Sequence, residues 1–185
     1  MSNDRNKGVK MREIELGSWV NPIGNLEQWL TDNLSESRLV LGMKTGIVSS
    51  TSASQYKILA CNCASTEMFR KGMSFNLGTT FCEAVVSQKT SVYYNRVGEI
   101  PDLKMHPCYE HMNLESYICA PIFTKEGDVF GTINFSSDEV RPQDFGYAEL
   151  NYIERIADVL RENIAGLREL DSTIEPVNAM AMLQG

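Results

Sequence analysis

The side chains best suited to chemistry in this sequence are its five cysteines and two histidines. His106 and His111 lie five residues apart in a segment without a clean apolar period, where a neutral imidazole could bind a metal or a haem iron. Cys61 and Cys63 share one face of a predicted strand and could complete a zinc site with Cys108 and a histidine. No facing Cys-x-x-Cys pair accompanies them, and a loop histidine more often caps the chain by hydrogen bonding. We therefore predict no metal site.

Other catalytic arrangements are missing from the sequence. We find no Ser/His/Asp set, no Walker-type phosphate loop and no paired carboxylates, so we predict no catalytic site. The cysteine count is odd, and three of the thiols lie in apolar strand or helix contexts. Structural disulfides are therefore not expected.

Length and charge narrow the class of protein further. A chain of 185 residues is long enough for about one domain. The net charge of −7 and the absence of a basic run argue against binding to nucleic acid or to an anionic membrane. The sequence shows neither a signal-peptide h-region nor about 18 consecutive apolar residues. We predict a cytoplasmic location.

The stretch 116–137 predicts the centre of the fold. Alternation of side chains indicates a strand at 116–124 that is covered on both faces, and a second strand at 129–137. The charged turn between them contains Gly127, which supplies the positive φ of a tight hairpin. Asn134 falls on a face that is otherwise buried, which is typical of a pocket wall.

Further elements follow from capping signals and periodicity. Asn25 is a candidate N-cap of a first helix, Thr80 with Glu83 predicts a capping box, and Gly146 with Glu149 opens the last helix. The segment 72–77 is expected to be an extended connection, and 96–113 a long functional loop. In order, we predict a helix from 26, a hairpin of strands 46–50 and 56–64, a short helix at 81–88, a strand at 91–95, the loop, the central hairpin and a terminal helix at 146–170.

This order favours an α+β fold with an antiparallel sheet of five or six strands, helices on one face and the long loop over the other. The predicted domain spans 23–168. It follows a partly disordered N-terminal arm at 1–22 and precedes a C-terminal tail at 169–185.

The terminal helix carries apolar residues at spacings of four and three, which is typical of a coiled coil. We therefore predict a homodimer formed through terminal helices, although packing on the sheet would use much of the same face. The residues of this seam are Ile153, Ala157, Leu160, Ile164 and Leu167.

Five short motifs in this order resemble those of a GAF domain, the small-molecule-sensing module of signalling proteins. The resemblance covers roughly residues 25–165 and is closest to the subgroup found in bacterial sensor kinases and diguanylate cyclases. It rests on GMSFNLGTTFC at 72–82, HPCY at 106–109, YICAPI at 117–122, GTINFSS at 131–137, and Arg141-Pro142 followed by Phe145.

The resemblance implies a non-catalytic sensory domain that holds a ligand between sheet and loop and signals through terminal helices to an output domain or partner. Covalent bilin is disfavoured because Cys108 is followed by Tyr109 rather than histidine, and the signature of cyclic-nucleotide-binding relatives is absent. The ligand itself is left open. The residues implied to surround it are Phe81, Cys82, Tyr94, His106, Tyr109, Tyr117, Cys119 and Asn134.

Two alternatives remain at this point. Free methionine-(R)-sulfoxide reductases are also GAF domains, and the resemblance would place their reactive thiols near Cys82 and Cys108. Here Phe81 would crowd such a thiolate and Glu83 would disfavour it. The second alternative is a dimerisation module whose pocket is filled by its own side chains.

Overall fold

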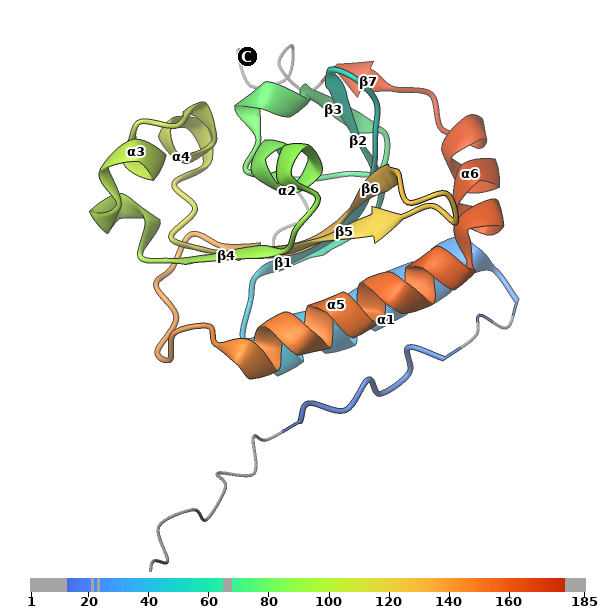
Figure 1. The fold of residues 1–185 in the computed structure, drawn as a ribbon, viewed down its shortest axis with the longest axis horizontal. Helices are drawn as coiled ribbons and strands as arrows, with labels where there is room; N and C mark the ends of the chain where they lie inside the picture. The colour runs from blue at the N-terminus through green and yellow to red at the C-terminus, as the bar shows by residue number, and fades with distance from the viewer. Residues whose placement is uncertain (1–12, 21, 23, 65–67, 179–185) are drawn as a thin grey trace, which may run out of the picture.

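A seven-stranded sheet organises the described part of the chain (Figure 1). The computed structural model describes residues 13–178 apart from 21, 23 and 65–67. The strand order is β4-β5-β6-β1-β2-β3-β7, and every neighbouring pair is antiparallel except β3 with β7. The strands are β1 (Thr45–Thr51), β2 (Gln55–Cys63), β3 (Met73–Asn76), β4 (Val92–Asn95), β5 (Ser116–Phe123), β6 (Val129–Ser137) and β7 (Val177–Asn178).

Helices cover both faces of this sheet. α1 (Leu26–Leu41) and α5 (Tyr147–Glu162) lie side by side across one face, whereas α2 (Cys82–Gln88), α3 (Pro101–Lys104) and α4 (Pro107–Met112) lie over the other (Figure 1). Two short 3₁₀ helices, η1 (Leu77–Thr79) and η2 (Val97–Glu99), lead into the second group. The α+β prediction is confirmed, but the prediction of helices on one face only is wrong.

The predicted strand count is wrong because the structure adds two short strands, β3 and β7. The segment expected to be a connection forms β3, which pairs with β2 only at Gln55–Lys57. β7 adds two residues in parallel to β3. The sheet is therefore mixed and has seven strands, rather than being antiparallel with five or six.

The predicted loop 96–113 is helical over much of its length. Pro101 and Pro107 occupy the first turns of α3 and α4, where a missing N–H costs nothing and the fixed φ suits a helix. His106 caps α4 through its side chain, since Nδ1 accepts from the N–H of Cys108 at 3.1 Å. Prolines at first-turn positions were the sequence signal for these helices.

The predicted terminal helix is interrupted. α5 ends at Glu162, and α6 (Ile164–Thr173) continues after Asn163 in a new direction toward the β3 edge (Figure 1). The Asn163 side chain donates to the carbonyl of Val159 at 2.8 Å, a contact that competes with helix continuation. Two predicted helix caps are confirmed. Asn25 caps α1, and the Gly146 N–H donates to the Glu149 side chain at the start of α5.

The predicted capping box at Thr80 is wrong. The Thr80 hydroxyl follows η1 and donates at 2.8 Å to the carbonyl of Leu77, the first residue of η1. α2 instead begins after Phe81 without a side-chain cap.

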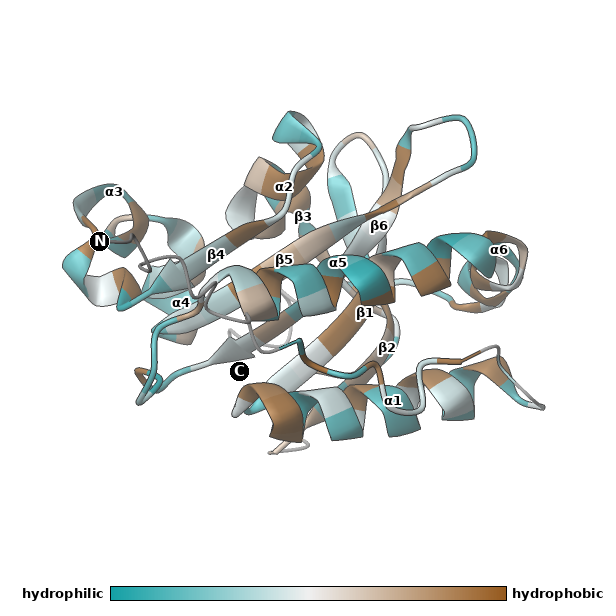
Figure 2. Cartoon of the chain, turned by 60° about the horizontal axis from the view of Figure 1, so that its bottom comes forward, coloured by the Kyte–Doolittle hydropathy of each residue, from teal (hydrophilic) through white to brown (hydrophobic). Residues whose placement is uncertain are grey.

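The sheet separates two apolar cores. Ile118, Ile133 and Phe135 are fully buried against α1 and α5, on which hydrophobic and hydrophilic residues alternate (Figure 2). Tyr117 and Cys119, from the same strand β5, lie in the opposite core under α2. The alternation predicted for 116–137 is thus confirmed over 117–122 and 132–135, whose two sets of side chains face the two cores. Phe130 departs from it, because it packs against the same core as Ile133, next to the irregular pairing at Ile122 and Phe123.

The described part of the predicted N-terminal arm packs on α1. Trp19 is buried, lies edge-on to Trp29 at 5.2 Å and donates to the Ser37 hydroxyl at 2.6 Å. The first twelve residues and the last seven, which belong to the predicted arm and tail, lie outside the described residues.

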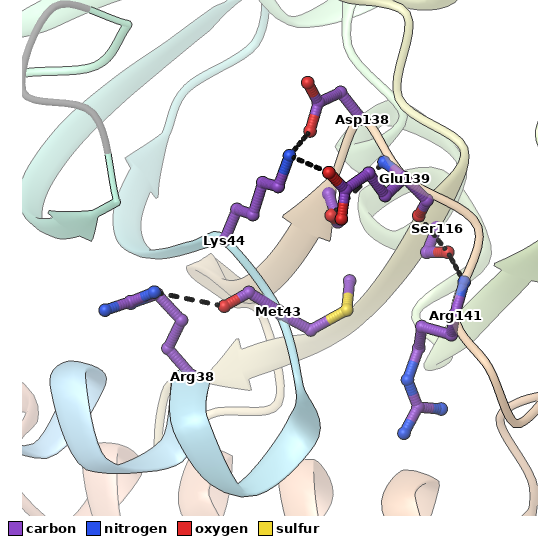
Figure 3. Close-up of polar contacts among 8 residues, drawn as sticks. Arg38, Met43, Lys44, Ser116, Asp138, Glu139 and Arg141 are labelled. Carbon is purple, nitrogen blue, oxygen red and sulfur yellow. Dashed lines mark hydrogen bonds and ion pairs between the residues drawn. The ribbon is translucent and has the colours of Figure 1, made fainter.

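A polar cluster fixes the end of the sheet where β1 and β5 begin (Figure 3). Lys44 forms ion pairs with Asp138 at 2.8 Å and with Glu139 at 2.6 Å. The Ser116 hydroxyl donates to the carbonyl of Glu139 and accepts from the N–H of Arg141. These contacts hold the connection between β6 and α5 against the sheet.

Candidate functional site

A small cavity of about 60 Å³ lies between the sheet and the helices α2 and α4. Its sheet side consists of side chains from five strands: Ile47, Tyr56, Phe75, Tyr117, Asn134 and Ser136. The remainder of its wall is formed by Phe69, Thr79, Thr80, Phe81, Cys82, Pro107, Cys108, His111, Met112 and Leu114. Among the described residues, no Asp, Glu, Lys or Arg lines this cavity.

Four of the eight predicted site residues line the cavity: Phe81, Cys82, Tyr117 and Asn134. Two more lie behind this wall. The ring of Phe81 contacts those of Tyr94 at 5.6 Å and His106 at 4.9 Å, and Tyr94 stacks on Tyr117 at 5.9 Å. Tyr94 and His106 therefore support Phe81 and Tyr117 rather than face the cavity.

The remaining two predicted residues have other surroundings. Cys119 is fully buried in the same core but does not line the cavity. Tyr109 points away from it, because its hydroxyl donates to the Glu115 carboxylate at 2.6 Å. The structure thus gathers Phe81, Cys82, Tyr117 and Asn134 around the cavity, whereas Tyr109 of α4 does not line it.

The polar atoms beside the cavity form a buried hydrogen-bond network around Cys82. Its Sγ lies 3.0 Å from the Tyr117 hydroxyl and accepts from the Thr132 hydroxyl at 3.4 Å and the Asn134 amide at 3.7 Å. The same amide donates to the Tyr56 hydroxyl at 3.0 Å. A network of this kind fixes the orientation of its members, because an unpaired buried polar group would be costly.

The thiols beside the cavity differ in acidity. Burial opposes ionisation of Cys82, but hydrogen bonds from Cys119, Thr132, Tyr117 and Tyr56 outweigh it and lower the pKa of Cys82 to about 7. The pKa of Cys119 is raised by burial and by its contact with Cys82. Burial also raises the pKa of Cys108 to about 12. The most acidic thiol, Cys82, is therefore also inaccessible, with only 3% of its surface exposed.

Sequence reasoning missed Tyr56 because of a β-bulge. Ser49 pairs with Ile58, whereas Val48 pairs with Ala60, so the side chains of β2 change face between these positions. Tyr56 and Ile58 enter the cavity-side core, and Ala60 enters the opposite one. No residue type in β2 indicates this shift.

Phe75 was missed for a different reason. It lies in the segment expected to be a connection, although Met73, Phe75 and Leu77 alternate there as on a strand. Cys108 and His111 line the cavity as well, although neither is among the eight predicted site residues.

Among the described residues, no group of three or more His, Cys, Asp or Glu side chains could hold a metal ion. His106 uses Nδ1 as a helix cap, as the capping interpretation required.

The site thus belongs to an α+β domain with a cavity between the sheet and short helices and with longer helices on the opposite face. The model of one such family, the GAF domain, matches residues 26–165. The chain therefore belongs to the GAF domain family.

Solved structures agree in fold. A phycocyanobilin-bound GAF domain from a cyanobacterial phytochrome has a TM-score of 0.62 at 18% identity, covering 78% of this chain and 86% of that one. The GAF domain of Acinetobacter phosphoenolpyruvate-protein phosphotransferase has a TM-score of 0.63 at 15% identity, covering 82% and 89%. A type II free methionine-R-sulfoxide reductase from Thermoplasma acidophilum has a TM-score of 0.59 at 16% identity, covering 82% and 96%.

These identities are too low to transfer an activity to this chain. A comparison with curated proteins gives no significant match. Within the described residues, none of the helices combines the length and apolar character needed to span a bilayer.

Proposed function

We propose that this chain is a non-catalytic sensory module whose ligand is a small, uncharged and mostly apolar molecule. The observation that carries this proposal is the cavity between the sheet and the helices α2 and α4, whose wall contains no Asp, Glu, Lys or Arg among the described residues. Burying an unpaired charge there would cost several kcal/mol, so an ionic ligand is disfavoured. Asn134 and the Tyr56 hydroxyl supply polar contacts for one hydrogen-bonding group.

The size of the cavity limits what it can hold as it stands. A cavity needs roughly 10–15 Å³ to hold one water molecule, so 60 Å³ accommodates only a few small groups. A larger ligand requires the α3–α4 cover to move. No residue of α3 or α4 is fully buried, and Met105 between them is 71% exposed. Segments with so little burial open at low free-energy cost, which makes this cover a suitable entrance.

A route from the cavity to the C-terminal segment supports a signalling role. Tyr56 and Phe75 line the cavity and pair with each other across β2 and β3. β3 also pairs with β7, and the Val177 N–H donates to the carbonyl of Gly72 at 2.7 Å. A ligand that displaces β3 would therefore act directly on the C-terminal segment, provided that it binds the two states with different affinity.

The reductase alternative is less well supported. Methionine sulfoxide carries an ammonium and a carboxylate group, and the described residues of the cavity wall offer neither of them an ionic partner. Cys82 lies beneath Phe81 in the core, and the raised pKa of Cys108 keeps that thiol protonated. A nucleophilic thiol must be both ionised and accessible, and neither residue combines the two properties.

The small volume does favour one alternative, the dimerisation module whose pocket is filled by its own side chains. The sensory module and this filled module can be distinguished with protein labelled at its methionine methyl groups, because Met112 lines the cavity whereas Met105 is exposed. We expect butanol and benzene to shift the Met112 methyl resonance and leave Met105 unchanged. Butyrate and benzoate, the charged analogues, should shift neither.

A matched pair of variants on α4 completes the test. Cys108→Phe places a ring in the cavity and should abolish the Met112 response, whereas Glu110→Phe adds the same ring at an exposed position and should preserve it. Native mass spectrometry of the full chain then reports any co-purified ligand. Absence of both a probe response and a bound ligand would favour the filled module.

A further inference from the structure

Two cysteines outside the cavity lie together at the end of β2. Cys61 and Cys63 are two residues apart, are packed against the same core and are half-buried, and neither lines the cavity. β3 pairs with β2 only at Gln55–Lys57, so in the described sheet no strand pairs with the outer edge of β2 at these cysteines. This end of the strand can adjust more easily than its centre.

The two sulfur atoms meet at one backbone group. The Sγ atoms of Cys61 and Cys63 lie 3.5 Å and 4.0 Å from the carbonyl oxygen of Phe69. Each thiol shifts the pKa of the other, and the backbone at Lys71 and Phe69 lowers the pKa of Cys61 and Cys63, respectively. The pair is therefore an adjacent dithiol held against one segment of backbone.

The two thiols have different acidity. The pKa of Cys63 is lowered by the hydrogen bond from Cys61, against the effect of burial, and further by the Thr45 hydroxyl and the positive charge of Arg38. Arg38 donates to the carbonyl of Met43 at 3.3 Å (Figure 3). It also donates to the side chain of Asn62 at 2.9 Å, and the two contacts hold it beside this strand end. The pKa of Cys61 is raised by the same sulfur–sulfur hydrogen bond and by burial. Cys63 can thus attack as a thiolate while Cys61 remains a thiol.

We propose that Cys61 and Cys63 form a reversible redox site that exchanges with small disulfides such as oxidised glutathione. The Cys63 thiolate attacks one sulfur of the small disulfide, whose S–S bond breaks and releases one thiolate. Cys61 loses its proton to solvent and attacks the Cys63 sulfur of the mixed disulfide, which releases the second thiolate. In total the protein loses two electrons and two protons, and one small disulfide becomes two thiols.

Geometry favours a bond that is readily reduced again. Two residues along a strand span roughly 6.4–6.8 Å between Cα atoms. This is the upper end of the range of up to about 6.8 Å that disulfides occupy, and disulfides at such limits are more easily reduced. Closure would also remove the two S–H groups from the Phe69 carbonyl, and the Phe69 ring lines the cavity. The redox state would therefore alter one part of the cavity wall.

The sequence allows a direct test on the full chain. Trypsin cleaves after Lys57 and Arg70, and the peptide 58–70 contains Cys61 and Cys63 but no other cysteine. After treatment with oxidised glutathione and alkylation of free thiols, we expect this peptide to have lost two hydrogen atoms, to carry no alkyl group and to regain both thiols with dithiothreitol. A peptide that stays fully alkylated, keeps glutathione or is linked to another cysteine would overturn the proposal.

Variants test the assigned roles. Cys61→Ser should stop at the mixed disulfide on Cys63, and Cys63→Ser should react several-fold more slowly. Thr45→Val removes a hydroxyl that faces Cys63 and should also slow the reaction. Cys108→Ser, the matched control at another half-buried thiol, should still close the bond at the wild-type rate. Equal reaction rates in Cys63→Ser and the wild type would refute the assignment of Cys63 as the attacking thiol.

Discussion

At the scale of single residues, His106 is predicted to bind the ligand but instead caps α4 in the α3–α4 cover of the cavity. Its ring lies 4.9 Å from that of Phe81, and its Nδ1 accepts the N–H of Cys108 at the start of α4. Burial lowers the pKa of His106, and the charge of Glu83 opposes this shift. The folded protein therefore prefers the neutral ring, whose Nδ1 can act as the cap.

This preference predicts that acid loosens α4. A histidine whose pKa is lowered by folding stabilises the fold fully above its ordinary pKa of about 6.5, and this contribution is lost as pH falls through the lower folded pKa. Protonation also occupies Nδ1 and removes the cap. We expect the hydrogen-exchange protection factors of 107–112, which are corrected for the pH dependence of intrinsic exchange, to fall more than those of α5 as the pH is lowered below the ordinary histidine pKa of about 6.5.

His106→Asn provides the control, because asparagine can cap a helix but does not titrate. The additional acid sensitivity of 107–112 should disappear in this variant. An unchanged pH dependence would show that His106 is not its source.

At the scale of elements, one lysine connects the C-terminal helix to the sheet. Lys57 of β2 forms an ion pair with Asp171 of α6 at 2.8 Å and donates to the carbonyls of Asp171 and Ile174. Ser50 of β1 donates to the same Asp171 carboxylate at 2.7 Å. These contacts fix α6 beside the strand that carries Tyr56 into the cavity.

Removal of this lysine should detach α6. Lys57→Met keeps most of the apolar stem but loses the charged hydrogen bonds, which we expect to cost about 1.5–3 kcal/mol of unfolding free energy. Hydrogen exchange in 164–174 should accelerate, while that of α1 follows only the global loss. Lys89→Met is the matched control, because the Lys89–Asp128 pair is exposed and should contribute less than about 1 kcal/mol. Equal effects of the two substitutions would contradict the role of Lys57.

At the scale of the whole molecule, the sheet separates two cores that differ in composition. The core beneath α1 and α5 is built mainly from aliphatic and aromatic side chains, whereas the opposite core contains the cavity, the polar network around Cys82 and all five cysteines within it or at its margin. The residues predicted as a dimer seam belong to the first core. Leu160 and Leu167 are fully buried within the monomer. The homodimer remains a prediction, but it requires another surface.

This arrangement predicts that Leu160 contributes to folding rather than to assembly. Leu160→Ala should lower the unfolding free energy by about 2–5 kcal/mol, as large-to-small changes in cores do. Leu39→Ala, on α1 with 69% of the residue exposed, should change it by less than about 0.5 kcal/mol. Urea unfolding measures both values, and light scattering reports the oligomeric state. If a Leu160 variant kept the wild-type stability but lost a dimer that the wild type forms, the predicted dimer seam would be correct.

Prediction from sequence succeeded where the signal is local. The central hairpin, the Asn25 cap and the opening of α5 all follow from alternation or from a contact within four residues. Two of the GAF motifs, YICAPI and GTINFSS, lie in the central hairpin, whereas GMSFNLGTTFC and HPCY lie in segments whose predicted structure is wrong. The family could therefore be recognised from residue types even where the local structure could not. Four of the predicted site residues line the cavity because strand alternation and the start of α2 already placed them on one side of the sheet.

What the sequence by itself determined about this protein is the α+β class, the order of its main elements and the face on which Tyr117 and Asn134 lie, since each depends on neighbours along the chain. Only the tertiary structure decided the strands β3 and β7, the bulge that turns Tyr56 inward, the break between α5 and α6 and the size of the cavity. The strand pairings, the bulge and the cavity depend on hydrogen bonds and packing between segments far apart in sequence, so no single segment determines them, and at the α5–α6 break the local contact of Asn163 competes with an otherwise continuous helical pattern.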